Sequence, residues 1–154
     1  MTSVSIVKEF TWSMAHMLAN HIGKCKNIHG HTYKMQIEIA RKGGGVLNKP
    51  GQTDDGMVLE FEELKTIINT NTVEALDHAF LYWVNSTDEL EHEIASLLKK
   101  HGRKVVDINY RPTAENLALD YLDKINNDLA AFKVEVVELV LWESPTSYAR
   151  VLNR

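Results

Sequence analysis

Three histidines near the start of the chain have residue types and spacing suited to a metal site. His29 and His31 flank Gly30 and directly precede a segment that predicts a strand, so both imidazoles would lie on one face if the strand extends back to them. His16 lies near the end of the preceding predicted strand, and an antiparallel return would bring it beside the pair. Three neutral imidazoles with one open position suit catalytic zinc. The alternative interpretation is surface histidines near a turn.

The single cysteine, Cys25, lies four residues before His29 and between Lys24 and Lys26. Nearby positive charge favours the thiolate form of a cysteine, so Cys25 could act as a base. The alternative is a small buried hydrophobic residue, and the two flanking lysines argue against burial. A lone cysteine cannot form an intramolecular disulfide, which suits a reducing compartment or a reactive role.

Two further positions carry carboxylates that could take part in chemistry. Asp77-His78 places a carboxylate next to an imidazole, although side chains adjacent in sequence need not point at one another. Glu143 follows the apolar run 139–142, so its carboxylate would emerge at the end of a buried strand. There it could bind an amidine-like edge of a ligand through two hydrogen bonds, or it could be an ordinary charge at the end of a strand.

Hydrophobic periodicity predicts three strands that would position these residues. Alternation over 34–39 predicts a half-buried strand whose Met35, Ile37 and Ile39 face inward. β-Branched and aromatic residues over 4–12 predict its antiparallel partner, and the segment 134–142 predicts a last, largely buried strand that ends at Glu143.

Helical signals occupy the rest of the chain outside one loop. The segment 41–56 holds five of the eight glycines and is expected to be a surface loop. Apolar spacing predicts a helix over about 60–71, and Pro112-Thr113 begins another, with Thr113 as its N-cap. A short helix ending near Gly102 and a strand over 104–108 look like a peripheral insertion at about 84–109. The order of elements predicts one α+β domain over 1–154.

Composition excludes several classes of protein. The 154 residues are 44% hydrophobic and 25% charged, which argues against a disordered or collagen-like chain. A net charge of −4 argues against an extended nucleic-acid surface. The longest apolar run, Ala79 to Val84, is far shorter than the roughly 20 residues that cross a bilayer, so no membrane partner is expected. The N-terminus lacks the features of a secretory signal, which favours a cytoplasmic protein.

Six motifs in sequence order resemble those of the 6-pyruvoyltetrahydropterin synthase family. The matching segments are Ala15-His16-Met17-Leu18, Cys25-x-x-x-His29-Gly30-His31, Gly56-Met57-Val58-Leu59-Glu60-Phe61, Asp77-His78, Pro112-Thr113-Ala114-Glu115-Asn116 and Glu143. Their order and spacing match from about Phe10 to Tyr148, which makes the set far more specific than any single motif.

The resemblance implies a fold and a site. The fold would be the tunnelling fold, in which a four-stranded antiparallel sheet carries two main helices on one face. Sheets of three subunits would join into a barrel, giving a homo-oligomer that is a trimer or a dimer of trimers (a homohexamer). By this resemblance, Zn²⁺ would be bound by His16, His29 and His31. Proton transfer would involve Cys25, Asp77 and His78, and Glu143 would bind the pterin ring.

The resemblance also implies a reaction. Three residues separate Cys25 from the His29-Gly30-His31 segment, as in the bacterial 6-carboxy-5,6,7,8-tetrahydropterin synthase branch. That branch converts 7,8-dihydroneopterin triphosphate to 6-carboxy-5,6,7,8-tetrahydropterin, acetaldehyde and triphosphate, a lyase step toward queuosine. The alternatives are a 6-pyruvoyltetrahydropterin synthase or sepiapterin-converting activity, and a non-catalytic zinc- or pterin-binding module.

Overall fold

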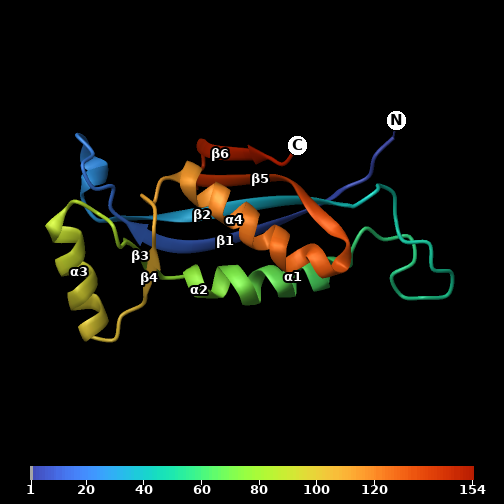
Figure 1. The fold of residues 1–154 in the computed structure, drawn as a ribbon, viewed down its shortest axis with the longest axis horizontal. Helices are drawn as coiled ribbons and strands as arrows, with labels where there is room; N and C mark the ends of the chain where they lie inside the picture. The colour runs from blue at the N-terminus through green and yellow to red at the C-terminus, as the bar shows by residue number, and fades with distance from the viewer. Residues whose placement is uncertain (1) are drawn as a thin grey trace.

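A six-stranded mixed sheet forms the centre of the computed structural model, which describes residues 2–154 (Figure 1). The strands, in the order β4-β3-β1-β2-β5-β6 across the sheet, are bounded as follows: β1 (Ile6–His16), β2 (His29–Arg41), β3 (Ala79–Trp83), β4 (Val105–Ile108), β5 (Val134–Ser144) and β6 (Ser147–Leu152). The helices are α1 (Phe61–Ile68), α2 (Glu74–Leu76), α3 (Glu89–Lys100) and α4 (Ala114–Leu129).

The sheet is larger than the four antiparallel strands expected from the sequence. β1, β2, β5 and β6 are antiparallel neighbours, but β3 and β4 extend the sheet beyond β1 with parallel pairing. β3 has five residues, and its first three are all buried, so it lacks the alternation that marks a half-buried strand. The expected strand number was therefore wrong, because a short strand without alternating burial has no period to detect.

Several other boundaries also differ from the expected ones. β1 and β2 extend toward one another as far as His16 and His29, so the strand continues back to the histidine pair. The predicted helix over 60–71 continues through a π-helical turn (Asn69–Val73) into α2. The final edge strand β6 was not predicted, and it follows β5 after a tight turn at 145–146.

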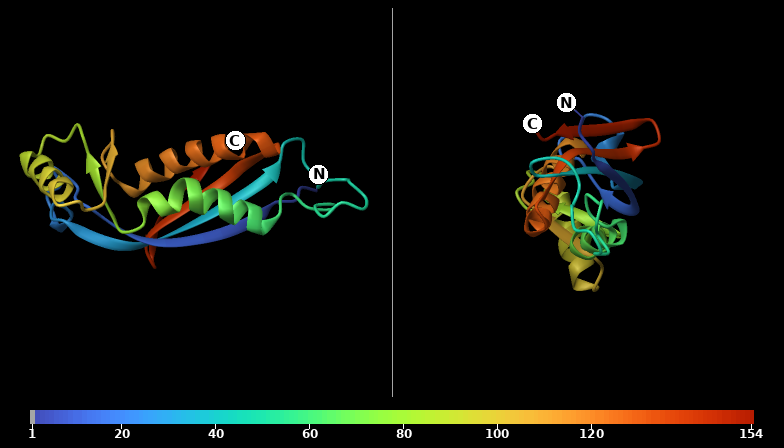
Figure 2. Two further views of the ribbon diagram at one scale, coloured as in Figure 1. Left: turned by 90° about the horizontal axis from the view of Figure 1, so that it is seen from below. Right: turned by 90° about the vertical axis from the view of Figure 1, so that its right-hand side faces the viewer.

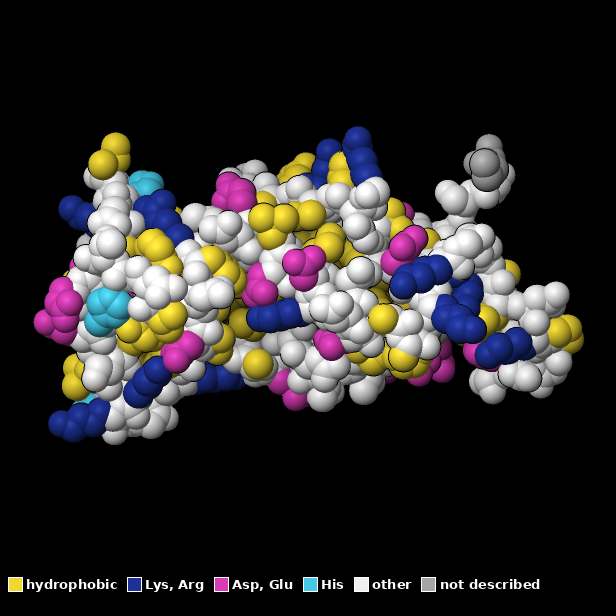
Figure 3. All heavy atoms as spheres, in the orientation of Figure 1, with side chains coloured by type: hydrophobic (Ala, Val, Ile, Leu, Met, Phe, Trp, Pro, Cys, Tyr) yellow, Lys and Arg dark blue, Asp and Glu magenta, His cyan; other side chains and the backbone are white. Residues whose placement is uncertain are grey.

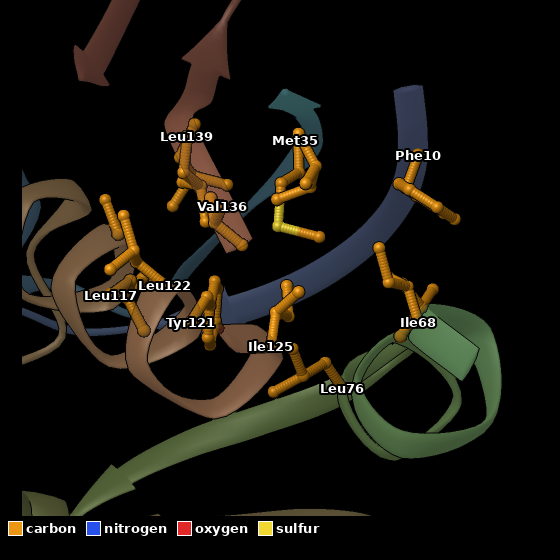
Figure 4. Packing of buried hydrophobic residues seen from close by; sticks show 14 of the residues in the cluster. Phe10, Met35, Ile68, Leu76, Leu117, Tyr121, Leu122, Ile125, Val136 and Leu139 are labelled. Atoms are coloured by element: carbon orange, nitrogen blue, oxygen red, sulfur yellow. The ribbon is translucent and has the colours of Figure 1, made fainter. Parts of the chain in front are cut away.

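Two helical segments cover one face of the sheet and enclose the main core. Figure 2 shows α4 and the α1–α2 segment lying side by side over the strands. Met35, Ile37 and Ile39 of β2 are fully buried, which confirms their predicted inward direction. In Figure 4, Ile125 and Tyr121 of α4 point toward the strands, among the aliphatic side chains of the core. The predicted N-cap is confirmed, because the Thr113 hydroxyl accepts a hydrogen bond from the Asn116 N–H at 3.2 Å.

The segment 84–109 lies at one end of the sheet, where α3 stands apart from the other helices (Figure 1). It packs through a second, smaller cluster of buried residues, Met17, Phe80 and Ala95. Figure 3 shows acidic and basic side chains interspersed over one face of the molecule. No helix within residues 2–154 has the length and apolar character needed to cross a membrane.

The core predicts unequal effects for two substitutions on α4. Ile125→Ala should lower the free energy of unfolding by about 2–5 kcal/mol, because Ile125 is 0% exposed and its truncation leaves a cavity. Leu119→Ala on the same helix is the matched control, since Leu119 is 53% exposed, and its effect should stay near 0.5 kcal/mol. Urea unfolding of both variants measures the difference. Equal losses would contradict this description of the core.

Candidate functional site

The register of β1 and β2 brings the three candidate metal ligands together. His16 lies directly opposite His29, and Met14 lies opposite His31, so all three imidazoles project from the helix-covered face. The ring centroids are 4.6 Å apart for His16 and His29, 4.9 Å for His29 and His31, and 5.3 Å for His16 and His31. One nitrogen of each ring lies within 4.8 Å of the others. The triad is a cluster that could hold a metal ion.

Backbone carbonyls determine which nitrogen carries the proton in two of these rings. The Nδ1 of His16 lies 2.7 Å from the carbonyl oxygen of Pro112, and the Nδ1 of His29 lies 2.8 Å from that of Asn27. A carbonyl only accepts hydrogen bonds, so each Nδ1 must donate and each neutral ring has a lone pair on Nε2. These two Nε2 atoms face one another at 3.1 Å. Two lone pairs at this distance repel, and a cation between them would remove the repulsion.

The third histidine, His31, also has a ring nitrogen that is not used in a hydrogen bond within residues 2–154. The Nε2 of His31 is buried and has no hydrogen-bond partner among the described residues. Burial is the main reason why the pKa of His31 is lowered, and Glu143 partly opposes this effect. Burial also lowers the pKa of His16 from 6.5 to about 4, against the Pro112 hydrogen bond, which raises it. Imidazoles bind metals in the neutral form, so the donor set fits a divalent cation.

Glu143 lies beside the triad at the end of β5. Its Oε1 is 3.3 Å from the Nε2 of His31. The neighbouring Tyr33 is fully buried, and its hydroxyl has no hydrogen-bond partner within residues 2–154. Burial, followed by the charge of Glu143, raises the pKa of Tyr33, so its hydroxyl stays protonated. The site therefore offers a carboxylate acceptor and a phenol donor next to the histidines.

Asp77 and His78 lie on the other side of β1, at the start of β3. Their side chains do point at one another, since His78 Nδ1 is 2.9 Å from Asp77 Oδ1. The same oxygen accepts the backbone N–H of Ser13 at 3.1 Å, and this bond is the main reason why the pKa of Asp77 is lowered. His78 is exposed, and together with His31 it lines a hollow of about 350 Å³.

Cys25 is half-buried in a short 3-10 turn (Lys24–Lys26), and it is not one of the clustered ligands. The loop that carries Cys25 is held in place at two points. Arg111 donates to the carbonyl of Ala19 through Nε at 3.1 Å and Nη2 at 2.8 Å, and Asn20 donates to the Thr87 hydroxyl at 2.7 Å. The candidate base thus sits on a loop that is anchored by Arg111, just before α4, and by Thr87 of the segment 84–109.

Sequence reasoning missed the groups that orient the histidines. The sequence marks Pro112 as the start of a helix and as part of a family motif, and it gives no signal at Asn27. Both act through a carbonyl oxygen, which every residue possesses, so no residue type marks the position. Arg111 lies directly before the predicted helix start at Pro112-Thr113. A charged side chain at that place was the one sequence signal for the contact with the Ala19 carbonyl.

Comparison with solved structures places the fold. An uncharacterized protein of Wolinella succinogenes superposes with a TM-score of 0.77 at 20% identity, covering all of both chains. The 6-pyruvoyl tetrahydropterin synthase of Caenorhabditis elegans gives a TM-score of 0.67 at 19% identity, covering 100% of this chain and 98% of the other. These likenesses show that the α+β fold is the one found in such synthases.

Sequence comparison gives the family. The model described as 6-pyruvoyl tetrahydropterin synthase matches residues 5–154. The 6-carboxy-5,6,7,8-tetrahydropterin synthase of Haemophilus influenzae is 41% identical over 143 residues, which cover 93% of this chain and 94% of the relative. With the family match spanning nearly the whole sequence, the chain belongs to the 6-pyruvoyl tetrahydropterin synthase family.

Proposed function

We propose that this protein converts 7,8-dihydroneopterin triphosphate and one water molecule to 6-carboxy-5,6,7,8-tetrahydropterin, acetaldehyde and triphosphate. The observation that carries the proposal is the histidine triad, with two Nε2 lone pairs facing one another beside Glu143. The name of the Haemophilus influenzae relative and the three-residue spacing before His29 support this product among those of the family. The product belongs to the route toward queuosine.

His16, His29 and His31 would hold Zn²⁺ through their Nε2 atoms. When bound there, Zn²⁺ would supply a Lewis acid that polarises an oxygen of the substrate side chain and acidifies the adjacent C–H. The carbonyls of Pro112 and Asn27 keep two of the imidazoles in the required tautomer. The chain thereby orients these ligands before any metal arrives.

Two residues of the chain, Cys25 and His78, would move protons, and Asp77 would support His78. Cys25 would take the proton from the substrate carbon as a thiolate. The His78 Nδ1–H donates to Asp77, so the neutral ring has its lone pair on Nε2 and can accept or return a proton there. The lowered pKa of Asp77 keeps its carboxylate charged, which would stabilise the imidazolium that forms.

Glu143 would anchor the pterin ring. The 2-amino and ring N–H groups of a pterin form two parallel donors, which match the two oxygens of a carboxylate. The position of Glu143 beside His31 would set the substrate side chain toward the histidines. We assign Glu143 to binding because its two oxygens can accept both of these donors.

The protein would act as a homo-oligomer, a trimer or a dimer of trimers. β4 and β6 are the outer strands of the sheet, so each has an unpaired edge in one chain. Pairing of such edges between three copies would join their sheets into a barrel and remove a surface that otherwise favours aggregation.

The reaction itself is tested by incubating the metal-loaded protein with 7,8-dihydroneopterin triphosphate. We expect mass spectrometry to detect 6-carboxy-5,6,7,8-tetrahydropterin, and a coupled assay to detect acetaldehyde in equal amount. A pyruvoyl product without acetaldehyde would assign the protein to the other branch of the family. Bound zinc with no conversion would favour a zinc- or pterin-binding module.

Removal of one ligand tests the metal site. His29→Ala should reduce the zinc content after dialysis from about one ion per chain to a small fraction of that, because only two imidazoles remain. His101→Ala is the matched control, since His101 is exposed just after α3, and it should keep its zinc. Metal analysis by mass spectrometry measures both variants. Equal zinc in the two would remove His29 from the ligand set.

Substitution of the candidate base separates proton transfer from metal binding. Cys25→Ala should keep the zinc content of the unmodified protein, since Cys25 is not one of the clustered ligands. Turnover should fall about 10²–10⁴-fold, the usual contribution of a positioned base. Steady-state kinetics and metal analysis of one sample provide both readouts. Undiminished turnover would exclude Cys25 from the mechanism.

A further inference from the structure

Lys104, at the start of the segment that becomes β4, holds the chain on both sides of Asp77-His78. Its Nζ donates to the carbonyl oxygens of Glu74 and Asp77, each at 2.6 Å. Its own carbonyl accepts the backbone N–H of Phe80 at 3.0 Å. These three hydrogen bonds enclose the turn that leads from α2 into β3, and Figure 2 shows β4 beside β3 at this end of the molecule.

The turn between these contacts has a backbone conformation that needs support. His78 has φ = +64°, in the left-handed region that residues with a Cβ rarely adopt. The helix formed by α1, the π-helical turn and α2 ends just before it, so its last carbonyl oxygens lack helical partners. An ammonium group satisfies such carbonyls and interacts favourably with the negative end of the helix dipole.

The left-handed turn is what directs the two side chains. With the backbone in this form, the His78 N–H donates to the Ser13 carbonyl at 2.6 Å, and the Asp77 carboxylate accepts the Ser13 N–H at 3.1 Å. The same arrangement brings the His78 Nδ1 to 2.9 Å from Asp77. Loss of the turn would therefore separate the imidazole from the carboxylate.

We propose that Lys104 is a positioning residue for the Asp77-His78 pair, and that the segment 84–109 thereby supports the site instead of being only peripheral. The catalytic part of this inference rests on the proposed function, whereas the structural part concerns the tautomer of His78 alone. Lys104 is itself exposed, so its substitution removes the two side-chain contacts without opening the core.

The structural part is tested by nuclear magnetic resonance of ¹⁵N-histidine-labelled protein, with a His78→Gln variant to assign the signal. In the unmodified protein, His78 should be the Nδ1–H tautomer, because it donates to Asp77. Lys104→Met should shift it toward the Nε2–H tautomer of free histidine. Lys100→Met, an exposed lysine at the end of α3, is the matched control and should leave the signal unchanged. An unchanged His78 signal in Lys104→Met would overturn the proposal.

Kinetics test the catalytic part on the same samples. Lys104→Met should lower kcat roughly tenfold to a hundredfold, the size expected when reacting groups are misplaced, with KM and zinc content unchanged. Lys104→Arg keeps a donor at this place and should restore most of the loss, which a defect in folding would not allow. If kcat stays unchanged in Lys104→Met, the positioning role is wrong. If the unmodified protein has no turnover but the tautomer shifts as expected, the proposed function fails and the positioning role stands.

Discussion

The antiparallel register between β1 and β2 is the constraint on which the candidate site depends. The same alternation that buries Phe10, Trp12 and Met14 continues to His16, and that of β2 continues back from Tyr33 through His31. A slip of one residue would turn every one of these side chains to the opposite face. The core therefore fixes the register, and the register in turn brings the histidines to one face at the end of the ladder.

The short segment before α4 contacts three parts of the structure: the start of the helix, a candidate metal ligand and the loop that carries Cys25. The hydroxyl of Thr113 caps the helix, the carbonyl of Pro112 sets the tautomer of His16, and the guanidinium of Arg111 holds the carbonyl of Ala19. The three contacts use different chemical groups, a hydroxyl, a carbonyl and a guanidinium, so all of them form at once. As a result, the position of α4 over the sheet is coupled both to the metal ligands and to the loop that carries the candidate base.

The strands added beyond the antiparallel part of the sheet position the second half of the site. β3 pairs with β1 at only two positions, and the backbone N–H and carbonyl of Ser13 in β1 hold the Asp77-His78 turn from this side. β4 lies on its other side, and Lys104 contributes the contacts that close the turn. A hollow lies across β1 and is lined by one candidate ligand, His31, and one candidate proton-transfer group, His78.

The sequence by itself determined the elements with a clear period or start signal, such as β2 and α4, and the identity of the candidate ligands, because residue type and spacing encode both. It did not reveal β3 or β6, since a short buried strand and an edge strand carry little periodic signal. Only the folded structure decided the tautomers of His16 and His29, the left-handed turn at His78 and the contacts of Lys104. The contacts of His16 and Lys104 depend on backbone carbonyls far away in the sequence, and that of His29 on the carbonyl of Asn27, two residues before it. A carbonyl is the same in every residue, so residue type marks none of these positions.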